Sequence, residues 1–187
     1  MNATNITLYF TNLIKQLILA LLLTLFGCQA SEAQDQEEKT NPEVTPEMVK
    51  AYVNTMSFED MEGVSHKLSD FRGKIVVLDF WQTWCAPCMR SFKGFQKAKE
   101  QWPEHLEILA LSPDWSDKSR HIKKFMRKHP YKFTFAWAGE LGEQLDLASI
   151  PFKIIISPEG ELIYAGTGTK GAEGEYNAIE KMIAQYF

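Results

Sequence analysis

Two cysteines separated by two residues, Cys85 and Cys88, are the part of this sequence best suited to chemistry. Thiols at this spacing form and open a disulfide with little backbone movement, and such pairs are typical of redox centres. The apolar run 75–81 ends just before them, so the pair lies where a buried strand is expected to turn into a helix. Ala86 and Pro87 fit the start of that helix, where proline is favoured.

The expected helix distinguishes the two thiols. Apolar residues recur at helical spacing after Cys85 until Pro103 ends the pattern, which places Cys85 near the helix N-terminus. Unpaired N–H groups and the positive end of the helix dipole stabilise a thiolate there. We therefore expect Cys85 to be the nucleophile. Cys88, one turn further in and more buried, is expected to attack the mixed disulfide and release the partner.

A C-x-x-C pair can also be half of a zinc site, or two unrelated core cysteines. Tetrahedral zinc requires four ligands, usually from a second such pair or from paired histidines. The sequence has no second pair, and none of its four histidines stands beside the motif: His66, His105, His121 and His129. We therefore expect no metal, and a site assembled from distant residues is the alternative.

The segment 77–88, with the sequence VLDFWQTWCAPC, resembles the active-site segment of the thioredoxin superfamily. Together with residues 68–76 it is similar, more narrowly, to the membrane-anchored TlpA/ResA-like thiol-disulfide oxidoreductases. The resemblance extends more weakly from about residue 58 to the C-terminus. It implies an α/β, thioredoxin-like fold with a central mixed β-sheet flanked by helices. It also implies that the Cys85–Cys88 disulfide is the redox group and that no other cofactor is needed.

The resemblance also assigns residues around the cysteine pair. Ile150 and Pro151 stand where the family has its cis-proline. This implies that Pro151 lies against the two sulfurs and that its neighbours, including Ile150, contact the partner protein. Trp84, next to the nucleophile, is the aromatic residue best placed for partner contact. One departure is Ser91, because many members of this family carry an acidic residue three positions after the second cysteine.

Asp79 interrupts the apolar strand six residues before Cys85. A carboxylate that faces a protein core is costly to ionise, so its pKa is expected to rise toward neutrality. Strand alternation places Asp79 with Ile75 and Val77 on one buried face. The resemblance implies that this acid relays the proton of Cys88. The alternative is that Asp79 points to solvent at the end of the strand.

The N-terminus indicates an export signal. Residues 17–26 are apolar or nearly so, Lys15 precedes them with no acidic residue earlier in the chain, and Gly27 and Cys28 follow. The run is too short to span a bilayer, which takes about 20 residues, and fits a signal-peptide core. The segment 25–28, LFGC, resembles a bacterial lipobox. We therefore expect a lipoprotein-type signal peptide at 1–27 and a lipid on Cys28; an uncleaved anchor helix or ordinary cleavage nearby are the alternatives.

The rest of the chain divides into a linker and one domain. Residues 28–45 have almost no large apolar side chain and are expected to form a flexible tether. Residues 46–187 have the size and composition of one domain. Its strands are expected at 74–80, 106–112, 133–137, 152–156 and 162–166, the last two as an antiparallel hairpin. Helices are expected at 86–102, 117–128 and 141–147 and near the C-terminus.

The net charge of −4 argues against nucleic acid as a partner. The sequence predicts an extracytoplasmic thiol-disulfide oxidoreductase, held by a lipid anchor in the bacterial cell envelope and facing the periplasm. The resemblance implies that it reduces disulfides of envelope proteins, for instance in cytochrome c maturation, with electrons from a membrane reductase. The alternatives are a thiol-dependent peroxidase and a non-enzymatic binding lipoprotein whose C-x-x-C is structural or binds metal.

Overall fold

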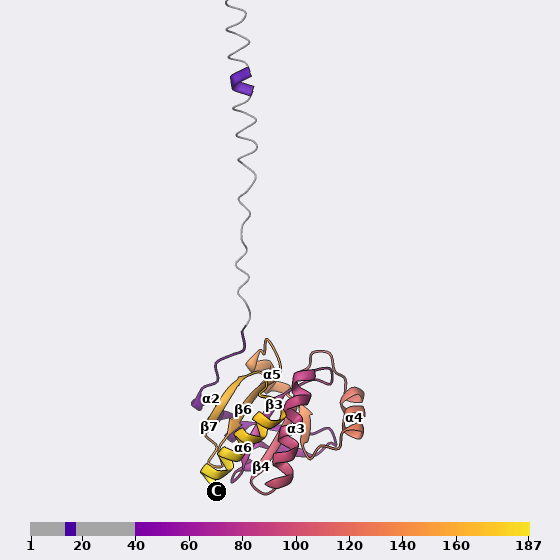
Figure 1. Ribbon diagram of the computed structural model, residues 1–187, viewed down its shortest axis with the longest axis vertical. Helices are drawn as coiled ribbons and strands as arrows, with labels where there is room; N and C mark the ends of the chain where they lie inside the picture. The colour runs from indigo at the N-terminus through magenta and orange to yellow at the C-terminus, as the bar shows by residue number, and fades with distance from the viewer. Residues whose placement is uncertain (1–13, 18–39) are drawn as a thin grey trace, which may run out of the picture. The chain divides into compact units, whose positions relative to one another are not determined.

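A mixed five-stranded sheet forms the centre of the computed structural model, which describes residues 14–17 and 40–187 (Figure 1). Its strands are β3 Ile75–Phe80, β4 Leu106–Ser112, β5 Thr134–Trp137, β6 Phe152–Ile156 and β7 Leu162–Thr167. They lie in the order β5-β4-β3-β6-β7. The pairs β3–β4 and β4–β5 are parallel, whereas β3–β6 and β6–β7 are antiparallel. The mixed sheet and the C-terminal hairpin predicted from the sequence are therefore confirmed.

The three central strands are buried along their whole length, since helices cover both faces of the sheet. Strands in this environment are expected to be apolar throughout. Each nevertheless carries one buried charged residue: Asp79 on β3, Glu107 on β4 and Lys153 on β6. These exceptions require specific partners or a functional reason, because a buried charge is costly.

Alternate residues of β3 face two separate apolar clusters. Ile75 and Val77 pack with residues of the helices α3 Ala86–Gln101, α4 Ser119–Lys128 and α6 Gly171–Tyr186. Val76 and Leu78 pack with residues of α2 Pro46–Thr55 and α5 Gly139–Leu145. We call the side covered by α3 and α6 the α3 face.

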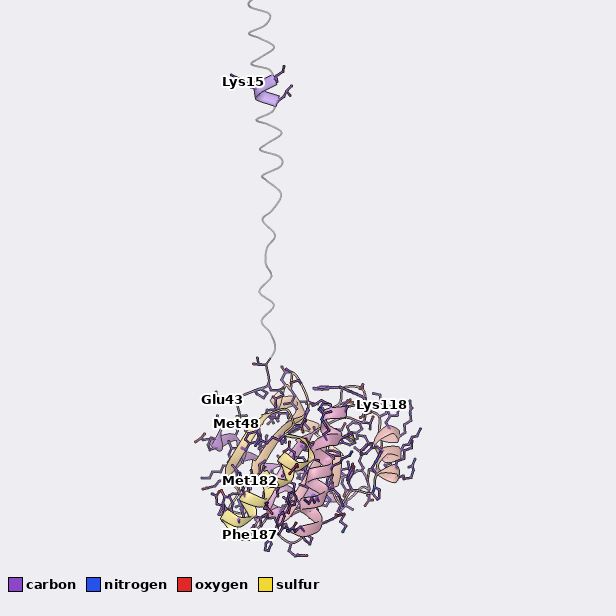
Figure 2. All side chains as sticks on the ribbon, in the orientation of Figure 1. Lys15, Glu43, Met48, Lys118, Met182 and Phe187 are labelled. Carbon is purple, nitrogen blue, oxygen red and sulfur yellow. A yellow bond between two sulfur atoms is a disulfide. The ribbon has the colours of Figure 1, made fainter. Side chains whose placement is uncertain are left out.

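The helices α3 and α6 lie side by side on the α3 face (Figure 1). They come close together at Gly94, where a Cβ would meet the backbone oxygen of Ala172 and the Cβ of Glu175. A glycine on α3 therefore allows α6 to come close to the helix that begins at the cysteine pair. Met182, which is labelled on α6 in Figure 2, packs against the same apolar cluster.

Several short elements before β3 were not predicted. They are the helix α2, the antiparallel strands β1 Ser57–Glu59 and β2 Ser65–Lys67, and the 3₁₀ helix η1 Leu68–Phe71. The hydroxyl of Thr45 caps α2 by accepting a hydrogen bond from the Met48 N–H at 3.3 Å, and Pro46 occupies the first turn. Val49 and Val53 are buried and attach α2 to the sheet.

Among residues 14–17 and 40–187, no helix is both long enough and apolar enough to cross a membrane. Most of the predicted signal peptide at 1–27, the predicted lipid-attachment residue Cys28 and most of the predicted tether at 28–45 lie outside the described residues. These expectations remain predictions.

Candidate active site

Cys85 and Cys88 form a disulfide at the N-terminus of α3, with their Cα atoms 5.3 Å apart. Cys85 is the N-cap residue of the helix, and its Sγ accepts a hydrogen bond from the backbone N–H of Cys88 at 3.2 Å. Pro87 lies in the first turn, as predicted. The Sγ of Cys85 therefore lies where helix N–H groups and the helix dipole stabilise negative charge after reduction.

Both cysteines are buried, and Cys88 is the more buried of the two, in the direction that the sequence predicted. Cys85 is 2% exposed and Cys88 is 0% exposed. Exposure alone therefore separates the two sulfurs only slightly, whereas the capping position belongs to Cys85 alone. The neighbouring Trp84 is 60% exposed and lies at the surface beside them. Trp81 and Phe152, by contrast, are core residues.

The peptide bond between Ile150 and Pro151 is cis. Phe152, the next residue, pairs with Phe80, the last residue of β3. Pro151 therefore lies at the end of the sheet at which β3 passes into the cysteine loop. Ile150 packs against the apolar cluster that contains both cysteines.

Asn41 holds the segment that precedes Ile150. Its Oδ1 accepts hydrogen bonds from the N–H groups of Ala148 at 2.7 Å and Ser149 at 3.0 Å. Its Nδ2 donates to the Ser149 carbonyl at 3.0 Å and to the Thr167 hydroxyl at 2.7 Å. This residue, which the sequence analysis included in the tether, thus contacts the loop next to the site.

Asp79 is fully buried on the α3 face, together with Ile75 and Val77. The alternative in which it points to solvent is therefore wrong. The pKa of its carboxyl is raised to about 8, mainly by burial; Lys153 opposes this rise and Glu175 adds to it, both by smaller amounts. Within residues 14–17 and 40–187, neither carboxyl oxygen has a hydrogen-bond partner. An unpaired acid with a pKa near neutrality is suited to proton exchange.

Comparison with known proteins assigns this arrangement to a family. The sequence model of the AhpC/TSA family matches residues 49–165. The chain belongs to the AhpC/TSA family. It is 33% identical over 122 residues to the thiol-disulfide oxidoreductase ResA of Bacillus thuringiensis subsp. konkukian (strain 97-27), a match covering 63% of this chain and 69% of ResA. It is 31% identical over 114 residues to ResA of Bacillus subtilis (strain 168), covering 59% and 63% of the two chains.

A solved structure supports the same assignment. The protein described as thiol:disulfide interchange protein DsbE from Chlorobium tepidum superposes with a TM-score of 0.59 at 26% identity, covering 70% of this chain and 92% of that one. The resemblance to thioredoxin-like oxidoreductases is thus confirmed. This AhpC/TSA family member is a thiol-disulfide oxidoreductase with a thioredoxin-like fold.

The oxidoreductase fixes its cysteine loop through Gln82 and Asp117, two residues that the sequence analysis did not identify. The Asp117 carboxylate accepts hydrogen bonds from the Thr83 N–H at 2.6 Å and hydroxyl at 2.7 Å. Gln82 donates to the Pro113 carbonyl at 2.6 Å and accepts from the Trp84 indole at 3.0 Å. These bonds tie the loop after β3 to the loop after β4, and so hold the residues leading to Cys85.

A buried ion pair on the α3 face was also not predicted. Lys153 on β6 and Glu175 on α6 lie 2.9 Å apart, and each side chain is 4% exposed. Two patterns in the sequence could have pointed to these residues. Lys153 interrupts an apolar strand as Asp79 does, and Glu175 precedes Ile179 and Ile183 at helical spacing.

The alternative metal site gains no support from the arrangement of ligands. Within residues 14–17 and 40–187 of this oxidoreductase, no three His, Cys, Asp or Glu side chains converge as metal ligands would.

Proposed function

We propose that this oxidoreductase reduces disulfides of other proteins by a two-step exchange at Cys85 and Cys88. The observation that carries the proposal is the placement of the disulfide on the N-terminus of α3, on the same face of the sheet as the unpaired Asp79. The pair itself carries the electrons, so the proposed mechanism uses no metal and no bound cofactor.

In the first step, the Cys85 thiolate attacks one sulfur of the partner disulfide. A bond forms between Cys85 and that sulfur, and the second partner sulfur leaves as a thiolate. Cys88 then attacks the Cys85 sulfur, which closes the Cys85–Cys88 disulfide and releases the first partner sulfur. Two electrons pass from the dithiol to the partner, which gains two thiols after protonation.

Asp79 provides the proton balance at the second cysteine. When a donor dithiol attacks Cys85 in the oxidised protein, Cys88 leaves as a thiolate and takes the proton of the neutral Asp79. When the reduced protein acts on a partner, the Asp79 carboxylate takes that proton back as Cys88 attacks. A pKa of about 8 makes both directions accessible near pH 7.

Partner docking is proposed for the surface around the disulfide. Trp84 offers an exposed indole, which is anchored by hydrogen bonds to Gln82 at 3.0 Å and Ser116 at 2.9 Å. Ile150 and Pro151 would contact the partner backbone on the other side. An exposed aromatic side chain with a fixed orientation is a frequent anchor for protein contact.

The proposed location is the bacterial cell envelope, with the domain attached to the membrane through a lipid on Cys28 and facing the periplasm. The segment 25–28 and the ResA relatives support this proposal. Substrates would be envelope proteins with accessible disulfides, such as apocytochrome c, and electrons would come from a membrane reductase.

The two-step mechanism is tested with residues 29–187 in an insulin-reduction assay, comparing Cys85→Ser and Cys88→Ser. Cys88→Ser is expected to accumulate a mixed disulfide through Cys85, detectable by mass spectrometry after alkylation, whereas Cys85→Ser forms none. If either variant keeps full insulin reduction, the mechanism is wrong. A faster reaction of Cys85 with peroxide than with insulin would favour the peroxidase alternative.

A further inference from the structure

Lys153, the buried cation opposite Asp79 on the neighbouring strand, does not form an ion pair with Asp79. Asp79 on β3 lies directly opposite Lys153 on β6 in the antiparallel register, and both side chains are buried. The Nζ of Lys153 instead donates to the Gly168 carbonyl at 2.6 Å and to Glu175 Oε1 at 2.9 Å. Both oxygens of Asp79 lack a hydrogen-bond partner among the residues that the structure describes.

Glu175 is held in place by the N-cap residue of its own helix, α6, and by a residue of α3. Its Oε1 accepts hydrogen bonds from the backbone N–H of Lys170 at 2.9 Å and from the hydroxyl of Ser91 at 3.3 Å. Ser91 lies on α3 one turn after Cys88, and Gly94 allows α6 to approach α3 at this level. Glu175 is therefore a fixed acceptor beside the active-site helix, built to receive the ammonium of Lys153.

We infer that Glu175 is a positioning residue that holds the Lys153 ammonium away from Asp79 and so leaves Asp79 free to exchange a proton with Cys88. The inference rests on the proposed proton-relay role of Asp79.

The charge balance of this cluster explains why the arrangement matters. Lys153 from β6 and Glu175 from α6 are the charged groups that influence the ionisation of Asp79. The helix α3 contributes Ser91 and the cysteine pair, which carries no charge while oxidised. With Lys153 and Glu175 paired, the cluster is neutral only if Asp79 holds a proton. Without Glu175, Lys153 would pair with Asp79, and the carboxylate would be locked in its charged form.

The test measures the titration of the Asp79 carboxyl directly, by carbon-13 NMR of aspartate-labelled, oxidised protein, with the signal assigned through Asp79→Asn. Glu175→Gln is expected to lower the pKa of Asp79 by about one unit or more, a roughly tenfold change in its ionisation ratio at a given pH. Adding Lys153→Met to Glu175→Gln is expected to abolish that decrease. Glu173→Gln, an exposed glutamate on the same helix, is the matched control and should leave the titration unchanged.

An unchanged Asp79 titration in Glu175→Gln, or an equal decrease in the double variant, would overturn the inference. If Glu175→Gln does not fold, Ser91→Ala replaces it: loss of one anchor of Glu175 is expected to shift the pKa of Asp79 in the same direction by a smaller amount, and no shift would overturn the inference.

Insulin reduction as a function of pH separates this inference from the proposed function. The inference predicts that the pH midpoint of activity moves with the Asp79 titration in Glu175→Gln. If the Asp79 titration shifts in Glu175→Gln but the parent protein reduces no insulin, the proposed function is refuted, whereas the inferred arrangement of the charged cluster stands.

Discussion

Two buried lysine–glutamate pairs lie in different parts of this protein and differ in what surrounds them. Lys99 on α3 and Glu107 on β4 lie 2.9 Å apart with side chains 11% exposed. Lys99 also donates to the Leu106 carbonyl at 2.6 Å, and the second oxygen of Glu107 accepts from the Thr134 hydroxyl at 3.2 Å. This pair is complete, and it ties the end of the active-site helix to the start of a strand.

The second pair, Lys153 and Glu175, lies toward the end of the sheet where β3 enters the cysteine loop. It has a third charged group beside it, Asp79, which takes part in none of its hydrogen bonds. A complete buried pair contributes to positioning because removal of one partner leaves an uncompensated charge. Where an unpaired acid lies beside such a pair, as Asp79 does here, that acid is the group proposed to exchange a proton. The comparison therefore separates a pair whose hydrogen bonds are complete from a pair that lies beside the proposed proton relay.

The largest expected effect on stability comes from replacing Asp79. Its pKa is higher in the folded chain, about 8, than the value of 3.8 of an unperturbed carboxyl, so the folded state keeps a proton that the unfolded state loses. Stability therefore falls as the pH rises from about 4 to about 8. Asp79→Asn removes this loss and is expected to stabilise the oxidised protein by about 4 kcal/mol at pH 7, while slowing exchange. Urea unfolding at several pH values measures it.

A stability gain in Asp79→Asn that is equal at pH 4 and pH 7 would contradict the raised pKa, because only the titration makes the gain depend on pH.

A substitution in the Lys99–Glu107 pair is expected to destabilise the protein, the opposite of the effect of Asp79→Asn. Glu107→Gln leaves the Lys99 ammonium without its counter-charge and is expected to lower the free energy of unfolding by about 3 kcal/mol. Because no titrating group of the relay changes, the pH profile of insulin reduction should keep its midpoint. Urea unfolding and the activity profile together measure both effects. A shifted midpoint would show that the two pairs are not functionally distinct.

The smallest expected effect on stability belongs to a residue outside both pairs. Trp84 is 60% exposed, so Trp84→Ala is expected to change the free energy of unfolding by less than about 1 kcal/mol. Loss of its contact area should slow reduction of insulin roughly fivefold, with little change for a small-molecule disulfide. Equal rates for both substrates relative to the parent chain would exclude Trp84 as a partner contact.

Much of the fold could be predicted because its central strands are continuous apolar runs. The bounds of β4 and β6 agree with the prediction, and alternation along β3 correctly placed Asp79 on the buried face. The helix α2 was missed although Thr45 and Pro46 provide a capping signal, since it is short and Val49 and Val53 are its only fully buried residues.

The partners of the charged residues could not be predicted. Alternation on β6 indicates the face of Lys153, but its choice of Glu175 over Asp79 depends on how α6 sits against α3. That packing is set at Gly94 by contacts between segments far apart in the sequence. The hydrogen bonds between Gln82 and the loop after β4 likewise depend on tertiary structure, as does the nearly equal burial of the two cysteines.

The central claim is that Cys85 and Cys88 form a reversible redox pair, and a redox titration of residues 29–187 against dithiothreitol and glutathione tests it most directly. Alkylation and mass spectrometry would count the thiols at each potential. The account predicts one two-electron transition that involves both cysteines, with a reduction potential near or below about −250 mV, as expected of a reductant. The account is contradicted if the pair shows no transition over the range of potentials set by the dithiothreitol and glutathione buffers, or if reduction releases only one thiol.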